Sequence, residues 1–318
     1  MTMLWPLART PRRSARPDPG DPGFPAFVLR TSPVLLLSGP PADGTDGTDA
    51  TDSTDGAADD AVARLLREWN PLAVAPQVAD GVRWSGPFRL DAASSAKARL
   101  PGGWSTAYAA QAARSRTRVP DGLDAPLVRL RYPDGLPTGA EAVAWSLIMG
   151  LARRLGGAGR LPAASPRRAQ AVTAQRALAQ ENSYCVYGNE ALSWSSLRSV
   201  LCLSLPELDR SGDAPRGDGD YCLDRPGAFE VRVESARAGG AGGFVPYALR
   251  ARGAEDWLGV VYRFQCLPQR SEPAAQRVGA QLRAAACLLA DVVGGVVLDG
   301  DGFPLVGAGM REVAAAGR

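Results

Sequence analysis

The sequence predicts an α+β fold of two tandem, related halves, each with the element order β-α-β-β-α-β. Two observations lead to this prediction. The pattern L-A-x-x-[L/V]-G-G occurs at Leu151–Gly157 and again at Leu289–Gly295, 138 positions later. In each half, a strand pattern that ends at a proline, Pro133 or Pro268, comes shortly before the helix that carries this ending.

The double glycines explain why the pattern recurs. A glycine readily adopts the left-handed conformation that terminates a helix, and the chain then turns back onto a sheet. A duplicated β-α-β-β-α-β unit of this kind has the split βαβ, or ferredoxin-like, arrangement. The alternative is that two unrelated helices of an Ala- and Gly-rich chain end in the same way.

Composition and pattern divide the chain into four parts. Residues 1–25 hold six prolines and four arginines and predict a disordered arm. The first half covers 26–165, the second half 166–310, and a tail 311–318. Within the first half, residues 42–57 predict a flexible acidic loop. Its aspartates recur at every third position without apolar anchors, and no closing glutamate follows at the spacing that a calcium loop requires.

The first half contains two predicted helices and three predicted strands ahead of its double glycine. A buried strand is predicted at 34–41, an amphipathic helix at 59–69, and an alternating strand at 81–90 with a bulge at Gly86–Pro87. A half-exposed strand follows at 126–133. The helix at 138–155 has an apolar stripe, and Thr138 with Glu141 predicts a capping box at its start.

The second half repeats this order after a polar connecting helix predicted at 166–182. Its apolar and alternating segments predict helices at 190–205 and 272–295, the latter with Pro273 in its first turn. Strands are predicted at 183–188, 228–234, 258–268 and 296–299.

Composition excludes several classes of function. The 36 basic and 33 acidic residues give a net charge of +3, too balanced to indicate a nucleic-acid partner. The absence of histidine excludes Ser-His and Cys-His nucleophile pairs and imidazole metal sites. None of the five cysteines forms a C-x-x-C pair, so no zinc or thioredoxin-like motif is present. We therefore expect no metal and no cofactor.

Three features predict a cytoplasmic protein. The odd number of cysteines indicates reduced, buried thiols. The twin arginines at Arg12 and Arg13 precede proline and aspartate instead of the apolar run of an export signal. No stretch approaches 18 uninterrupted apolar residues, so no membrane association is expected.

Seven residues are candidates for ligand or partner binding. Arg129 and Arg131 lie on the open face of a predicted strand, where they could bind an anion or be solvated. Glu141 and Trp145 begin a helix, where a capping residue and a core aromatic are the alternatives. The remaining candidates belong to the polar-aromatic cluster Gln180–Glu190, around a predicted strand: Tyr184, Tyr187 and Asn189.

Other motifs indicate structure more than chemistry. Cys185 would need an arginine or a helix dipole to form a thiolate, so a buried structural thiol is the simpler interpretation. Asp299 and Asp301 resemble the start of a calcium loop, but lack its closing acidic residue and predict a tight turn. The glycine-rich segments do not have the spacing of a phosphate-binding loop.

These exclusions favour a non-catalytic module that binds a protein partner, a second copy of itself or a small ligand across the junction of its halves. The alternative is a histidine-independent enzyme that uses carboxylate, arginine and tyrosine groups in the cleft between the halves. Nucleic-acid binding is the weakest hypothesis, because aromatic and basic residues combine only around Tyr262–Phe264.

Overall fold

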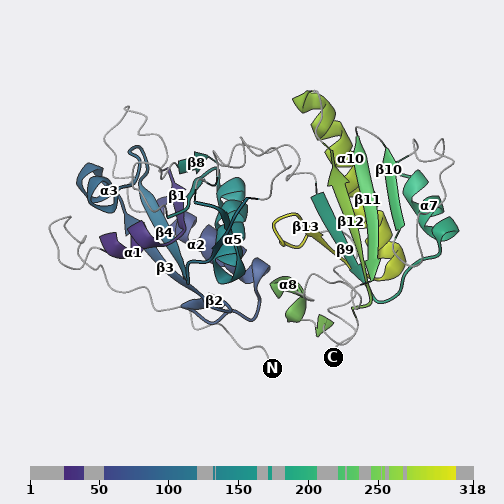
Figure 1. The fold of residues 1–318 in the computed structure, drawn as a ribbon, viewed down its shortest axis with the longest axis horizontal. Helices are drawn as coiled ribbons and strands as arrows, with labels where there is room; N and C mark the ends of the chain where they lie inside the picture. Colours follow the sequence, from purple (N-terminus) through teal and green to yellow (C-terminus); the bar gives the residue numbers. More distant parts are fainter. Residues whose placement is uncertain are drawn as a thin grey trace.

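A computed structural model shows a mixed α+β protein in which helices pack against antiparallel sheets (Figure 1). The parts of the chain that it describes are residues 25–38, 54–119, 132, 134–162, 171–173, 183–205, 221–225, 228–235, 245–251, 253–254, 258–267 and 271–305.

The first sheet has six strands in the order β2-β3-β4-β1-β7-β8, and all neighbours are antiparallel. A separate pair of short strands, β5 (Arg116–Thr117) and β6 (Leu136–Pro137), precedes the second long helix. The strands of the main sheet are β1 (Val34–Leu37), β2 (Gln77–Ala79), β3 (Val82–Arg89), β4 (Thr106–Ala112), β7 (Ala158–Arg160) and β8 (Ala171–Thr173).

Helices cover both faces of this first sheet. Helices α2 (Thr54–Trp69) and α5 (Gly139–Leu155) pack on one face, and the short helices α1 (Ala26–Thr31) and α3 (Ala92–Ala98) pack on the other. The central strand β1 is buried along its whole length, because its side chains alternate between the two helical layers.

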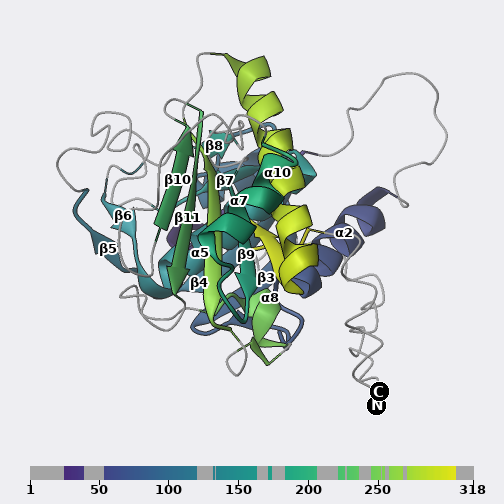
Figure 2. The ribbon, with the colours of Figure 1, turned by 90° about the vertical axis from the view of Figure 1, so that its right-hand side faces the viewer.

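The second sheet has five antiparallel strands in the order β10-β11-β12-β9-β13. Helices α7 (Trp194–Cys202) and α10 (Glu272–Val293) lie together on one face (Figure 2). The short helix α8 (Tyr247–Arg250) packs against part of the other face. The strands are β9 (Ser183–Gly188), β10 (Tyr221–Arg225), β11 (Phe229–Ser235), β12 (Val260–Cys266) and β13 (Val296–Asp299).

The two sheets have the same strand order when each is numbered along the chain. In both, the order is second, third, fourth, first and fifth, and β8 adds one edge strand to the first sheet. In both sheets a longer helix follows the first strand (α2 or α7) and the fourth strand (α5 or α10), and a short helix follows the third strand (α3 or α8). Counting the strands of each main sheet and these longer helices alone, the order is β-α-β-β-β-α-β, with one strand more between the helices than in the predicted β-α-β-β-α-β order.

The double glycines end the helices as predicted. Gly156 (φ 64°, ψ 25°) and Gly294 (φ 59°, ψ 30°) adopt the left-handed conformation and close α5 and α10. The glycine that follows has a different role. A Cβ at Gly157 would lie 2.5 Å from the carbonyl oxygen of Leu36, and a Cβ at Gly295 would lie 2.5 Å from that of Tyr187. Both carbonyls belong to the first strand of their half, so glycine permits the same close approach twice.

Several local predictions differ from the structure. The capping box at Thr138 does not form, because Glu141 binds Arg116 and the Ser115 backbone instead. Residues 171–173 form β8, which pairs with β7, and not part of the predicted connecting helix. The bulge predicted at Gly86–Pro87 is confirmed by a register shift between Ser85 and Phe88.

Some predictions concern residues outside the described part of the chain. They are the arm up to residue 24, positions 42–53 of the acidic loop, most of the strand at 126–133 and the tail at 311–318. Where the chain is described, no helix combines the length and apolar character needed to cross a membrane.

Candidate functional site

The two halves meet where the turn after β13 inserts into the first half. Phe303 is only 1% exposed and belongs to the core cluster of α2, α5 and the first sheet. Gly150 of α5 makes room for it, because a Cβ there would lie 2.7 Å from the Phe303 ring. The guanidinium carbon of Arg154 lies 3.8 Å from the ring centroid. The second half therefore contributes a core side chain to the first.

Ion pairs surround this inserted side chain. Arg153 donates from Nε to Oδ2 of Asp301 at 2.9 Å, and its Nη2 binds Oδ1 of the same carboxylate. Arg154 pairs with Asp299 and lies 3.5 Å from Asp301. Burial raises the pKa of Asp301, and the charge of Arg153 opposes this rise. The carboxylates at this contact are thus occupied by guanidinium groups.

The turn itself has the tight geometry predicted from the sequence. Oδ1 of Asp299 accepts the backbone N–H groups of Asp301 and Phe303, each at 3.0 Å. Within the described residues, no three His, Cys, Asp or Glu side chains are placed to hold a metal ion.

A second contact between the halves involves α8, which lies between the two sheets in Figure 1. The rings of Trp69 and Tyr247 are 4.9 Å apart, and Trp69 donates from Nε1 to the Asp301 carbonyl at 3.2 Å. Asp80 accepts a hydrogen bond from Arg250 at 2.8 Å, and its backbone N–H donates to the Tyr247 hydroxyl at 3.1 Å.

An apolar loop lies between these contact residues of the first half. We call residues 71–76, which follow α2, the junction loop. Leu72 is 59% exposed and Val74 is 74% exposed, and the flanking Pro71, Ala75 and Pro76 are exposed as well. Since Trp69 before the loop and Asp80 after it both touch α8, the loop lies beside the place where the halves meet.

The junction loop is held in a defined conformation. The buried Asn70 donates from Nδ2 to the Val78 carbonyl at 2.6 Å, and its Oδ1 accepts the Leu72 N–H at 3.1 Å. Ala73 points into the core, and the Pro76 carbonyl accepts the Trp84 N–H at 2.7 Å. The exposed apolar side chains therefore extend from a fixed backbone.

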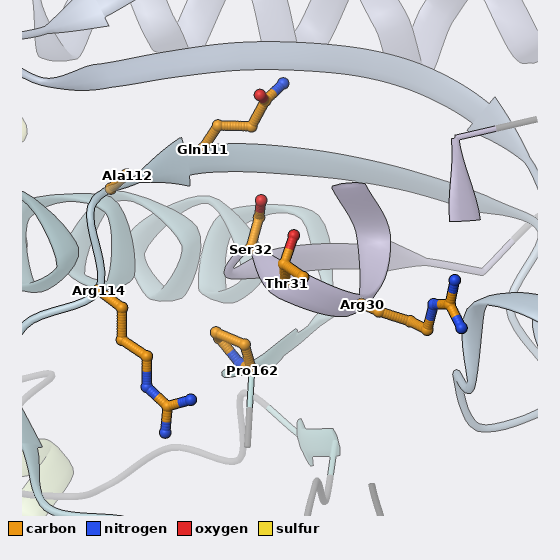
Figure 3. A pocket seen from close by; sticks show the side chains of 7 residues that line it. All are labelled: Arg30, Thr31, Ser32, Gln111, Ala112, Arg114 and Pro162. Atoms are coloured by element: carbon orange, nitrogen blue, oxygen red, sulfur yellow. The ribbon is translucent and has the colours of Figure 1, made fainter. Parts of the chain in front are cut away.

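A polar pocket lies elsewhere, on the α1 side of the first sheet. It has a volume of about 430 Å³. Figure 3 shows the guanidinium groups of Arg30 and Arg114 on opposite sides of it, with Thr31, Ser32 and Pro162 between them. Gln111 and Ala112 complete the lining. We call this the arginine pocket.

The sequence-predicted candidates do not come together into one site. Glu141 is 1% exposed and forms a two-point ion pair with Arg116, whose Nη2 also donates to the Pro162 carbonyl at 3.0 Å. This ion pair holds β5 against α5 and the end of β7. Trp145 is a core residue that donates from Nε1 to the Tyr132 hydroxyl at 3.2 Å.

The candidates on β9 are also separated. Tyr184 lies in the core under α7 and α10, whereas Tyr187 packs on the opposite face with α8. Burial raises the pKa of both phenols, so both stay protonated at neutral pH. Asn189 is exposed just after the strand. Arg129 and Arg131 lie outside the described residues.

Cys185 matches the structural alternative better than the nucleophilic one. Its Sγ lies 3.8 Å from Nη1 of Arg263, but burial is the stronger influence and raises the pKa of the thiol. Arg263 is also engaged by Glu234, to which its Nε donates at 2.8 Å. A thiol in this setting is protonated at neutral pH.

The sequence does not predict the junction loop or the arginine pocket. Leu72 and Val74 resemble core residues in the sequence, and only the fold shows that they are exposed. The residues of the pocket come from α1, β4 and the end of β7, which no spacing along the chain connects. In comparisons with known proteins, no family model, no curated protein and no solved structure matches the chain.

Proposed function

We propose that this chain is a non-catalytic module that binds a protein partner, or a second copy of itself, at the surface where its halves meet. The junction loop is the apolar centre of that surface, and α8 lies beside it. The partner thus contacts both halves. The observation that carries this proposal is the fixed conformation of an apolar loop whose two largest side chains are exposed.

A fixed apolar loop suits binding for two physical reasons. Exposed apolar surface gains free energy when a partner removes it from water. A loop that is already ordered loses little conformational entropy when it binds, so more of the favourable free energy of burial remains as binding free energy. Within the described part of the chain, Leu72 and Val74 stay exposed, so a partner that covers them gains this free energy.

We further propose that the shared strand order and the repeated double glycine arose by duplication of one unit. The duplicated unit has become asymmetric at the junction. Arg153 and Arg154 of α5 are replaced by Asp291 and Val292 at the matching offset in α10. Only the first half therefore has the arginines that bind the turn after β13. The proposed binding surface thus forms once in the molecule and not at an equivalent place in both halves.

The test compares partner binding by the wild type and by a variant in which the exposed side chains of the junction loop are polar and the fold is unchanged. Tagged wild-type chain and the double variant Leu72→Ser/Val74→Ser are purified from the native host at moderate salt, and bound proteins are quantified by mass spectrometry. Sedimentation of the pure chain tests self-association. We expect a stoichiometric partner or a dimer with wild type, and its loss with the double variant.

The control is Leu203→Ser, which removes a leucine that is 76% exposed at the end of α7. In Figure 1, α7 lies on the side of the second sheet away from the first sheet. This variant is expected to bind like wild type. If the double variant keeps every partner of the wild type, or if the wild type is a monomer without partners, the proposal is wrong.

A further inference from the structure

We infer that the arginine pocket binds an oxyanion, a carboxylate or a phosphate, in the electrostatic field of the buried Arg160. This site is separate from the junction surface. It is formed by the first half alone, on the face of the sheet opposite to α5.

Arg160 is the unusual residue of this region. It is 2% exposed, and within the described part of the chain its side chain makes one hydrogen bond, from Nη2 to the carbonyl of Leu29, near the end of α1. Its Nε is buried without a partner, and no described carboxylate pairs with it. A buried charge without a counter-charge costs free energy, so packing alone gives no reason for an arginine here.

Strand register places this charge next to the pocket floor. Val34 of β1 pairs with Ala109 of β4 on one side and with Arg160 of β7 on the other. The same registers, extended by two residues, bring Ser32 beside Gln111 and Pro162, three residues that line the pocket. Residues two apart on a strand share a face, about 7 Å from each other. Arg160 therefore lies on the same face of the sheet as the pocket residues Ser32, Gln111 and Pro162, two residues away along the strands.

The pocket itself offers groups that bind oxyanions. Arg114 has a side chain that is 45% exposed, and within the described residues its Nη2 contacts Asp134 at 3.2 Å. Arg30 also lines the pocket, and its Nε donates to the Ala26 carbonyl at 3.2 Å. Guanidinium groups donate charge-assisted hydrogen bonds to carboxylates and phosphates.

Among the described residues, the charge balance around the pocket is positive. Arg30, Arg114, Arg116 and Arg160 outnumber the two described carboxylates, of which Glu141 pairs with Arg116 and Asp134 lies beside Arg114. Burial lowers the pKa of Arg160 to about 10, which still leaves this guanidinium charged at neutral pH. An anion bound in the pocket would bring a negative charge close to Arg160.

The test is calorimetric titration of the full chain at low ionic strength, with inorganic phosphate in one series and succinate in another. The variants are Arg114→Gln, at the rim, and Arg160→Met, which removes the buried charge with little loss of volume. The control is Arg64→Gln, which removes an exposed arginine of α2, far from the pocket in the fold. Circular dichroism and thermal unfolding verify the fold of each variant.

We expect saturable binding of at least one anion by wild type and by the control. Each pocket variant should weaken it about tenfold or more, as expected for one charge-assisted hydrogen bond or one nearby buried charge. Binding of phosphate alone or of succinate alone identifies the ligand class and supports the inference. No saturable binding of either anion, or equal weakening by all three variants, overturns it. Arg114→Gln keeps the test decisive if Arg160→Met does not fold.

Discussion

Arg153 of α5 and Asp301 of the turn after β13 form a two-point ion pair across 148 positions of the sequence. Together with the burial of Phe303 in the first half, this pair makes the two halves parts of one packed structure. The surface proposed for partner binding lies beside this contact. Substitutions that weaken the contact at Arg153, Asp301 and Phe303 are therefore expected to disturb the proposed binding surface as well.

Phe303 is expected to contribute strongly to stability. Phe303→Ala removes a fully buried ring from the core of the first half and should lower the free energy of unfolding by about 3–5 kcal/mol. Urea unfolding followed by tryptophan fluorescence and circular dichroism measures this loss. The matched control is Phe27→Ala, at a side chain that is 70% exposed, which should change stability little. Equal effects of the two substitutions would contradict the packing described here.

Asp301 predicts a particular dependence of stability on pH. Its folded-state pKa is raised, so the folded protein holds this proton more tightly than the unfolded chain does. The contribution of Asp301 to stability therefore falls as pH rises from its ordinary value of 3.8 through the raised pKa. In Asp301→Asn this contribution is absent, so the stability of the variant relative to wild type should increase as pH rises above about 4. Urea midpoints at several pH values measure it, and a constant or decreasing difference would contradict the assignment.

The second glycine of each pair should be intolerant of any side chain. Gly157→Ala and Gly295→Ala place a Cβ against a strand carbonyl, so the chain must shift, and each should cost about 2–3 kcal/mol. Thermal unfolding of these variants checks the values. Gly102→Ala is the control, because nothing lies within 4 Å of its Cβ position. If only one of the two pairs responds, the two helix endings are not equivalent.

Arg160 should be destabilising in the protein without a ligand. Arg160→Met replaces a buried charge with an apolar side chain of similar length and should raise the free energy of unfolding by about 1–3 kcal/mol. Arg64→Met, at an exposed position, should leave it nearly unchanged. Denaturation in phosphate-free and carboxylate-free buffer measures both. A large loss of stability in Arg160→Met would show that this guanidinium has a structural role.

Strands with large apolar side chains are predictable from the sequence, and strands with small side chains are not. β1 and β12 are rich in Val, Leu and aromatic residues and were predicted, whereas β4, with the sequence TAYAAQA, was not. Ala107 and Ala109 face the α1 layer, and Ala110 faces the α5 layer, so β4 is buried on both faces. It lacks the run of large apolar side chains by which β1, buried in the same way, is recognised in the sequence. The short strand β2 and the strand β10 were also missed.

The candidate sites show the same limit. Glu141 and Trp145 are candidates in the sequence because a charged residue and a large aromatic residue begin the same helix. In the structure they bind other residues of the first half, Arg116 and Tyr132, and not a common ligand site. The residues that form the junction surface and the arginine pocket have ordinary sequence contexts. Leu72 is significant because it is exposed, and Arg160 because it is buried with an unpartnered Nε and with no carboxylate paired to it among the described residues.

The sequence by itself determined the α+β class, the long helices and the double-glycine endings. These features follow from local periodicity and from the backbone freedom of glycine, which act within a few residues. Only the tertiary structure decided the strand order, the insertion of Phe303 into the first half and the placement of Arg160 beside a pocket. Those features depend on which distant segments pack together, and that is a property of the whole folded chain.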